Sequence, residues 1–168
     1  CQVLQDVIEM TAQTIPRNIR IKFDDCACPI SVYMDKTQLT QVFLNIIINA
    51  RDAIADAQDG CIAINLMPIS VDDDLKRHYL LDTTGSYVRI DISDNGCGIR
   101  KNIIPRIFDP FFTTKTQEQR KGTGLGLSIT YTIIKNAGGN IRVVSQRAKG
   151  STFSILLPQS TTLITETR

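Results

Sequence analysis

Three glycines alternate with small or apolar residues in the stretch KGTGLGLSIT, residues 121–130. Glycine permits positive φ angles and close backbone approach, and the free N–H groups and dipole at the start of a helix favour an anion. The spacing of Gly122, Gly124 and Gly126 matches neither the G-x-G-x-x-G nor the G-x-x-x-x-G-K-[ST] phosphate motif. The stretch is therefore either a phosphate-binding turn that opens a helix or a flexible, glycine-rich entry to a packed helix.

A second glycine cluster follows an alternating strand pattern in DISDNGCGI, residues 91–99. Asp94 stands where that pattern ends, so a carboxylate is held beside a turn. An ionised carboxylate accepts hydrogen bonds and donates none, which suits an exocyclic amine such as N6 of adenine. The D-N-G sequence is also typical of an ordinary turn.

Two amide side chains, Asn45 and Asn49, are four residues apart in a segment with helical periodicity, and Asp52 lies nearly in line with Asn49. Amide oxygens are hard ligands for Mg²⁺, which usually keeps several waters and is completed by nucleotide phosphates. Alternatively, the two asparagines cap neighbouring backbone groups.

Apolar periodicity predicts the helices that position these residues. Residues 3–12 have helical spacing that ends before Pro16, and residues 35–59 form a longer helix with Asp35 as N-cap. A third helix spans residues 125–137 and stops at two glycines. A short helical turn is expected around residues 101–108.

Alternation of apolar and polar residues predicts the strands. They cover residues 19–23, 30–34, 61–70, 87–94, 140–146 and 151–158. The order predicts a two-layer α/β sandwich, in which a mixed, largely antiparallel sheet is covered on one face by helices. The polar stretch at residues 71–85 is expected to be a mobile excursion, and the aperiodic stretch at residues 109–122 a functional or disordered loop.

Length and composition indicate one folded, water-soluble domain. The chain has 168 residues, 42% hydrophobic and 21% charged, and its net charge of +2 is too small to suggest a nucleic-acid surface. No apolar run reaches the roughly 18 residues needed to cross a bilayer. The five cysteines lack zinc-like spacing and favour reduced thiols over a disulfide framework. The start at Cys1, within an amphipathic pattern, suggests a fragment of something longer.

Five segments in this order resemble the N, G1, F, G2 and G3 boxes of sensor histidine kinase catalytic domains, which belong to the ATPase/kinase (GHKL) superfamily shared with gyrase and MutL. The segments are QVFLNIIINARDAI, DNGCGI, FDPFFTTK, GTGLGLSI and GGNIRVVSQRAKGSTFSILLP. The resemblance covers roughly residues 20 to 158 and implies a Bergerat-type ATP-binding fold. It divides the chain into the end of a preceding linker or dimerisation helix (1–14), the ATP-binding domain (15–158) with an ATP lid at about 109–122, and a flexible tail (159–168).

The resemblance also implies ATP and Mg²⁺ as cofactors. Asn49 resembles the Mg²⁺ ligand, Asn45 a supporting ligand or phosphate contact, and Asp94 the aspartate that binds adenine. The other residues to which it assigns a place in the nucleotide site are Asp52, Gly96, Gly98, Ile99, Phe112, Lys115, Gly122, Thr123, Gly124, Leu125, Gly126, Leu127 and Thr152. One departure concerns Asp52, since many sensor kinases carry a basic residue near this position. Asp52 could order a Mg²⁺-bound water or cap a backbone group, while Arg51 is expected to point away around the helix.

The superfamily contains hydrolases and kinases. In its hydrolases a glutamate one turn before the metal-binding asparagine polarises water, whereas this chain has Asn45 there, which disfavours self-contained hydrolysis. The expected reaction is transfer of the γ-phosphoryl group to a histidine, with no general base named in this chain. The single histidine, His78, lacks the context of a phosphoacceptor. A dimer-gated ATPase and a nonenzymatic nucleotide-binding module remain the alternatives.

The expected partners follow from the same resemblance. They are a histidine-containing dimerisation domain upstream in the parent protein and the receiver domain of a response regulator, in a two-component system. No nucleic acid and no direct membrane contact are expected. The parent is expected to be a homodimer, with this domain monomeric in isolation and cytoplasmic, and with an inner-membrane anchor possible in the parent.

Overall fold

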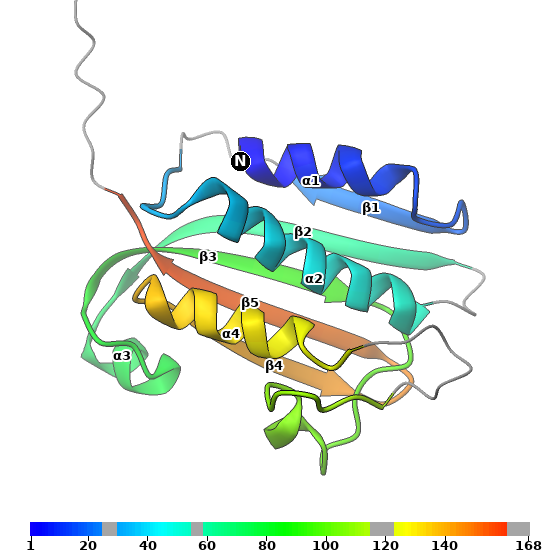
Figure 1. The fold of residues 1–168 in the computed structure, drawn as a ribbon. Helices are drawn as coiled ribbons and strands as arrows, with labels where there is room; N and C mark the ends of the chain where they lie inside the picture. Colours follow the sequence, from blue (N-terminus) through cyan, green and yellow to red (C-terminus); the bar gives the residue numbers. More distant parts are fainter. Residues whose placement is uncertain (25–29, 55–58, 115–122, 161–168) are drawn as a thin grey trace, which may run out of the picture.

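The described residues form two layers, a five-stranded sheet and three helices packed on one of its faces (Figure 1). The structure is a computed structural model that describes residues 1–24, 30–54, 59–114 and 123–160. The helices are α1 (Gln2–Ala12), α2 (Lys36–Ile54), α3 (Asp73–Tyr79) and α4 (Gly126–Asn136), with a 3₁₀ helix at Ile104–Arg106. The strands are β1 (Ile19–Asp24), β2 (Gly60–Val71), β3 (Gly85–Asp94), β4 (Asn140–Gln146) and β5 (Gly150–Pro158).

The sheet has the strand order β1-β2-β3-β5-β4. Strand β1 pairs with β2 in parallel, and the other neighbouring pairs are antiparallel. The predicted α/β sandwich with a mixed, largely antiparallel sheet is therefore confirmed.

The main apolar core lies between the sheet and helices α1, α2 and α4. It contains Val7, Phe43, Ile46, Ile47, Ile90, Ile134 and Ile155, all at most 2% exposed. Each such side chain contributes about 1.5–3 kcal/mol relative to an exposed position. Helix α2 starts as predicted, because the Asp35 carboxylate accepts a hydrogen bond of 2.9 Å from the N–H of Gln38.

Helix α1 packs into this same core through Leu4 and Val7, and an ion pair of 2.9 Å joins Asp6 to Lys36 at the start of α2. Residues 2–12 are thus packed as part of the sandwich. The assignment of residues 1–14 to the end of a preceding linker or dimerisation helix stays a prediction.

The prediction of a strand at residues 30–34 is wrong. Only Val32 makes a β-bridge, to Gln159, because the chain bends at residues 33 and 34 to enter α2. The same bridge holds the first residues of the predicted tail: Gln159 donates to the carbonyl of Ser86 at 2.9 Å and Ser160 to that of Ser31 at 2.8 Å. Residues 161–168 lie outside the described part of the chain.

The connector expected to be a mobile excursion contains helix α3. Asp72 caps its N-terminus by accepting a hydrogen bond of 2.8 Å from Leu75, and Asn140 of β4 donates to the carbonyl of Tyr79 at 2.6 Å. A second apolar cluster, formed by Val71, Leu81, Tyr87 and Leu156, lies beside it. Since Tyr87 and Leu156 point opposite to Val88 and Ile155 of the main core, α3 covers one end of the other sheet face.

Candidate functional site

A cavity of about 370 Å³ opens where α2 and β3 end, on the helix-covered side of the sheet. It is lined by Asn49, Asp52, Ala53, Asp94, Cys97, Gly98, Ile99, Ile103, Ile107, Phe112, Thr113, Thr114, Leu127, Ser151 and Phe153. Its size is within the range of small-molecule sites. The structure therefore brings together residues of α2, the β3 end, the loop after it, α4 and β5, and seven of them were singled out in the sequence: Asn49, Asp52, Asp94, Gly98, Ile99, Phe112 and Leu127.

Asp94, the last residue of β3, is 9% exposed and faces this cavity. Its Oδ1 accepts a hydrogen bond of 2.9 Å from the N–H of Gly96. Burial raises the pKa of the Asp94 carboxyl above its usual value, and hydrogen bonds from Gly96 and Ser151 oppose that rise. The result is a fixed acceptor in a largely apolar wall.

The turn after Asp94 is held by Asn95 rather than left open. Asn95 Oδ1 accepts a hydrogen bond of 2.8 Å from Cys61, and Asn95 Nδ2 donates to the carbonyl of Asp59 at 2.8 Å. The N–H of Cys97 donates to the carbonyl of Ala53 on α2 at 2.9 Å. These bonds fix the carboxylate relative to α2.

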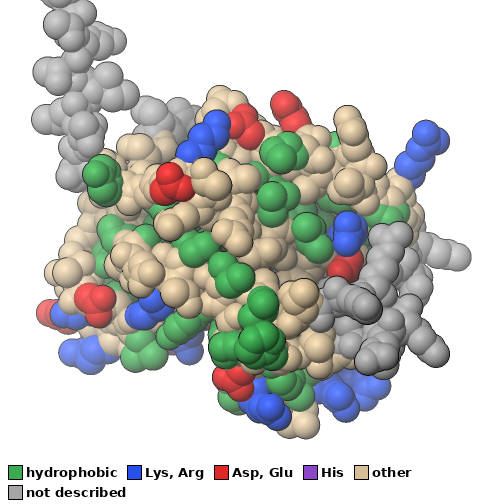
Figure 2. Space-filling view, in the orientation of Figure 1, with side chains coloured by type: hydrophobic (Ala, Val, Ile, Leu, Met, Phe, Trp, Pro, Cys, Tyr) green, Lys and Arg blue, Asp and Glu red, His purple; other side chains and the backbone are tan. Residues whose placement is uncertain are grey.

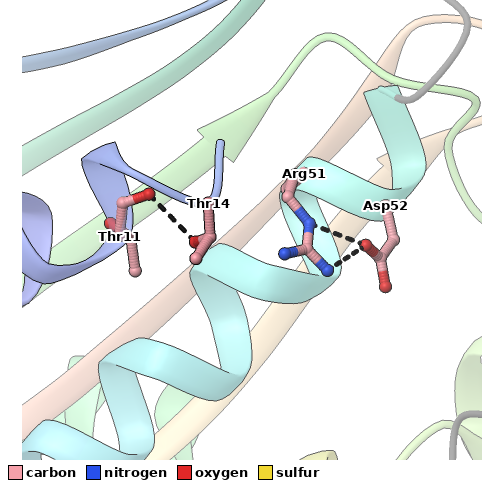
Figure 3. A network of polar contacts seen from close by, with 4 residues as sticks. All are labelled: Thr11, Thr14, Arg51 and Asp52. Atoms are coloured by element: carbon pink, nitrogen blue, oxygen red, sulfur yellow. Dashed lines mark hydrogen bonds and ion pairs between the residues drawn. The ribbon is translucent and has the colours of Figure 1, made fainter. Parts of the chain in front are cut away.

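The metal-ligand candidate Asn49 is half-buried at the cavity wall, one turn before Asp52 and Ala53. Arg51, which was expected to point away around the helix, is absent from the cavity wall and pairs with the neighbouring Asp52. The Arg51 guanidinium donates to Asp52 Oδ1 from Nε at 2.9 Å and from Nη2 at 2.7 Å (Figure 3). A flexible side chain can bend along the helix to form such a pair.

Asn45 does not line the cavity, although it lies one turn before Asn49. Its Nδ2 donates to the carbonyl of Gly126 at 3.0 Å and to the hydroxyl of Thr130 at 3.2 Å. The structure thus places this amide between α2 and α4.

Thr152, to which the resemblance assigns a place in the nucleotide site, is absent from the lining of this cavity. Its hydroxyl lies 2.9 Å from that of Ser93, and strand alternation directs the preceding residue, Ser151, into the cavity toward Asp94. The β5 hydroxyl that reaches Asp94 is therefore that of Ser151, one residue before Thr152.

Gly150 is a structural requirement of the site that the sequence reasoning missed. Its φ is +102°, and a Cβ at this position would lie 1.8 Å from the carbonyl oxygen of Asp94. The G-S-T-F sequence at the start of β5 was the available signal. Gly98, with φ +65°, is similarly constrained, since a Cβ there would lie 2.1 Å from the carbonyl oxygen of Gln146.

The aromatic side of the cavity comes from the loop after the 3₁₀ helix. Phe112 lines the cavity and carries the Arg106 guanidinium 4.8 Å from its ring centre. Phe111 has φ +64° and is 74% exposed. Gly124 lies against the Phe111 backbone, where a Cβ would approach to 2.5 Å, so the chain segments before and after residues 115–122 meet at these two residues.

The remaining sequence-predicted residues are distributed as follows. Five of them are close in sequence to residues that line the cavity but are absent from its wall: Gly96, Thr123, Gly124, Leu125 and Gly126. Lys115 and Gly122 lie outside the described residues, as does most of the predicted lid at 109–122.

No helix in the described ranges is both long enough and apolar enough to span a bilayer. Within those ranges, no three His, Cys, Asp or Glu side chains are grouped closely enough to hold a metal ion.

The sandwich and its cavity, with a buried carboxylate at a strand end and glycine-rich turns around it, define a nucleotide-binding α/β domain. The family model described as "Histidine kinase-, DNA gyrase B-, and HSP90-like ATPase" matches residues 34–161. The chain belongs to this family, and it is an ATP-binding catalytic domain of the histidine kinase type.

Similar proteins agree with this assignment. The sensor kinase CckA of Brucella abortus (strain 2308) is 40% identical over 157 residues, which cover 94% of this chain and 16% of that protein. The sensory histidine kinase/phosphatase NtrB of Rhizobium leguminosarum bv. phaseoli is 36% identical, covering 94% of this chain and 40% of that protein. The solved catalytic domain of histidine kinase ThkA aligns with a TM-score of 0.71 and 29% identity over 94% of this chain and 90% of that domain. The chain thus spans less than half the length of CckA and of NtrB.

Proposed function

We propose that this domain binds ATP with Mg²⁺ and donates the γ-phosphoryl group to a histidine on a separate dimerisation and phosphotransfer domain. The observation that carries the proposal is that Asp94 and Asn49 line one cavity, as a carboxylate for the base and an amide for the metal would have to do.

Recognition of adenine rests on Asp94. Its carboxylate is held by Gly96 and Ser151 and keeps acceptor capacity for an exocyclic amine. Apolar neighbours, including Ile99, Ile107 and Phe153, provide surfaces against which a flat base packs. ATP fits this arrangement better than a nucleotide whose base presents a carbonyl oxygen at the same position.

The donor set fits Mg²⁺ only in the company of phosphates. Asn49 supplies one amide oxygen, and Asp52 lies on the same wall of the cavity. Mg²⁺ typically takes one or two protein ligands and completes its shell with water and nucleotide oxygens. When bound, the ion would neutralise charge on the phosphates, while the protein groups hold the nucleotide in position.

Transfer is favoured over hydrolysis by the contacts of Asn45. The position that holds a glutamate in the hydrolases has an amide here, and its nitrogen is engaged by Gly126 and Thr130. An amide oxygen is too weakly basic to activate water. His78 is exposed on α3, at the opposite end of the sheet from the cavity, so the acceptor has to come from another domain.

A surface for that domain lies next to the cavity. Phe111, Ile129 and Tyr131 are exposed to 74%, 36% and 38%, and the Tyr131 ring lies 5.5 Å from that of Phe108. Figure 2 shows hydrophobic side chains over α4 and the loop below it. We expect the dimerisation domain of a homodimeric parent to contact this surface, with a response-regulator receiver as the later acceptor. ATP is a cytoplasmic metabolite, so we place the domain in the cytoplasm.

The test is incubation of the parent kinase with γ-labelled ATP and Mg²⁺. We expect label that is stable in base and labile in acid, as for phosphohistidine, and much less label when the parent carries Asp94→Asn. Release of labelled phosphate without labelled protein would support the ATPase alternative. Binding of ATP with neither outcome would support a nonenzymatic module.

A further inference from the structure

We infer that Thr130 is a positioning residue for the triphosphate side of the site, acting through Asn45. The inference rests on the proposed function, but it concerns a residue that does not line the cavity. It also gives Asn45 a different role from the metal or phosphate contact expected from the sequence.

The inference starts from one side-chain amide that joins two helices. Asn45 Nδ2 donates to the Gly126 carbonyl at 3.0 Å and to Thr130 Oγ1 at 3.2 Å. Gly126 is the first residue of α4 and Thr130 lies one turn further along it. The two acceptors therefore fix the direction of the first turn of α4 as well as its distance from α2.

The surroundings make this contact difficult to replace. Thr130 is 0% exposed, so water cannot substitute for its hydroxyl. Asn45 itself is half-buried, so an amide N–H left without a partner there is unfavourable, which favours the arrangement in which both acceptors are present. The approach of the helices at this point does not require glycine at position 126. A Cβ there would lie 3.5 Å from Asn45 Cγ, in van der Waals contact.

The two helices carry different walls of the cavity. One turn beyond Asn45, α2 presents Asn49, and directly after Gly126, α4 presents Leu127. The free N–H groups at the start of α4 are suited to a phosphate. A change in the Asn45–Thr130 contact would therefore move the start of α4 relative to Asn49, while Asp94 at the end of β3 keeps its own hydrogen bonds.

This separation within the site allows a specific test. We propose Thr130→Val, which keeps the branched shape but removes the hydroxyl, and Thr132→Val as its matched control. Thr132 lies on the same helix, is exposed, and donates only to the Ser128 carbonyl of its own helix, at 3.0 Å. The affinities of the 168-residue chain for ATP with Mg²⁺ and for adenosine are measured by calorimetry.

We expect Thr130→Val to weaken ATP binding about 3- to 10-fold, the effect of one neutral hydrogen bond, and to leave adenosine affinity unchanged. Thr132→Val should change neither affinity. Equal weakening of ATP and adenosine by Thr130→Val would indicate general loss of structure and overturn the inference, as would unchanged affinity for both. If wild-type chain binds adenosine and ATP equally well, the proposed function itself fails.

A double-mutant cycle separates positioning by Asn45 from direct contact with a phosphate. If Asn45 acts through α4, Asn45→Ala in the Thr130→Val background should weaken ATP binding by less than it does in wild type. Fully additive losses would show that Asn45 acts independently of Thr130 and would overturn the inference.

Discussion

Replacement of Asp94 by asparagine tests the base-binding role of the buried carboxylate. Oδ1 of Asp94 accepts from the Gly96 N–H at 2.9 Å, and in Asp94→Asn the side-chain oxygen should keep this place. The NH₂ group then occupies the other position, turned toward the ligand. A donor would face the donor amine of adenine, and the hydrogen bond to a charged acceptor would be lost.

The size of the effect follows from that exchange. Hydrogen bonds to charged groups contribute about 1.5–3 kcal/mol, which corresponds to an ATP affinity weaker by about 10- to 150-fold. The measurement is titration calorimetry of ATP into the chain in the presence of Mg²⁺. Backbone contacts of the turn should persist, because Asn95 and Cys97 hold it independently of the carboxylate.

Asp91→Asn is the matched control for this experiment. Asp91 is on the same strand but points to the opposite sheet face, where its carboxylate lies 3.0 Å from Nε of Arg89. We expect Asp91→Asn to bind ATP as wild type does. Equal affinity of Asp94→Asn and wild type, or equal weakening in both variants, would refute the reasoning.

Three further predictions follow. Asn49→Ala should reduce the enhancement of ATP affinity by Mg²⁺, measured by titration with and without the metal; an unchanged enhancement would remove Asn49 as ligand. Gly124→Ala should lower the melting temperature, because the φ of Gly124 is +68° and a Cβ there would lie 2.5 Å from the Phe111 backbone. As a control, Gly126→Ala should melt near the wild-type temperature, since a Cβ there would meet nothing closer than 3.5 Å. Equal melting temperatures of the two variants would contradict this prediction. Burial raises the pKa of Asp94 in the folded protein above that in the unfolded chain. The free energy of unfolding therefore falls as the pH rises from the ordinary aspartate pKa through the folded pKa. At neutral pH the ionised Asp94 lowers stability. Without nucleotide, Asp94→Asn should therefore melt at the wild-type temperature or above it at pH 7, by scanning calorimetry, and a lower melting point would count against the burial effect.

The spacing of apolar residues was sufficient to predict the helices that bury a regular apolar face. Helix α2 is predicted from Val42, Phe43, Ile46 and Ile47, all of which are in the core, and α4 begins and ends within one residue of its prediction. Helix α3 was missed because its seven residues have no buried side chain and are held instead by contacts to their ends. The pattern at residues 30–34 resembles a strand but has only one pairing position, which depends on where the chain bends.

For the site, ordered motifs identified the segments, but not the direction of individual side chains. Asp94 and Asn49 were found because strand ends and helical faces can be counted from the sequence. That Ser151 and not Thr152 lines the cavity could not be predicted, because it depends on which face of β5 turns inward, and that is set by pairing with β3. The contacts of Asn45 with α4 span 81 and 85 residues, a distance over which no local pattern carries information.

The position of β5 in the sheet has a consequence for synthesis of the chain on the ribosome. Although β5 is the last of the described strands along the chain, it lies between β3 and β4 and contributes Ser151 and Phe153 to the cavity. Until residues 150–158 have emerged, the nascent domain exposes one unpaired edge of β3, and β4 has no partner strand. Completion of the sheet and competence to bind nucleotide therefore arise in the same late step, so a translation product that stops after α4 has neither.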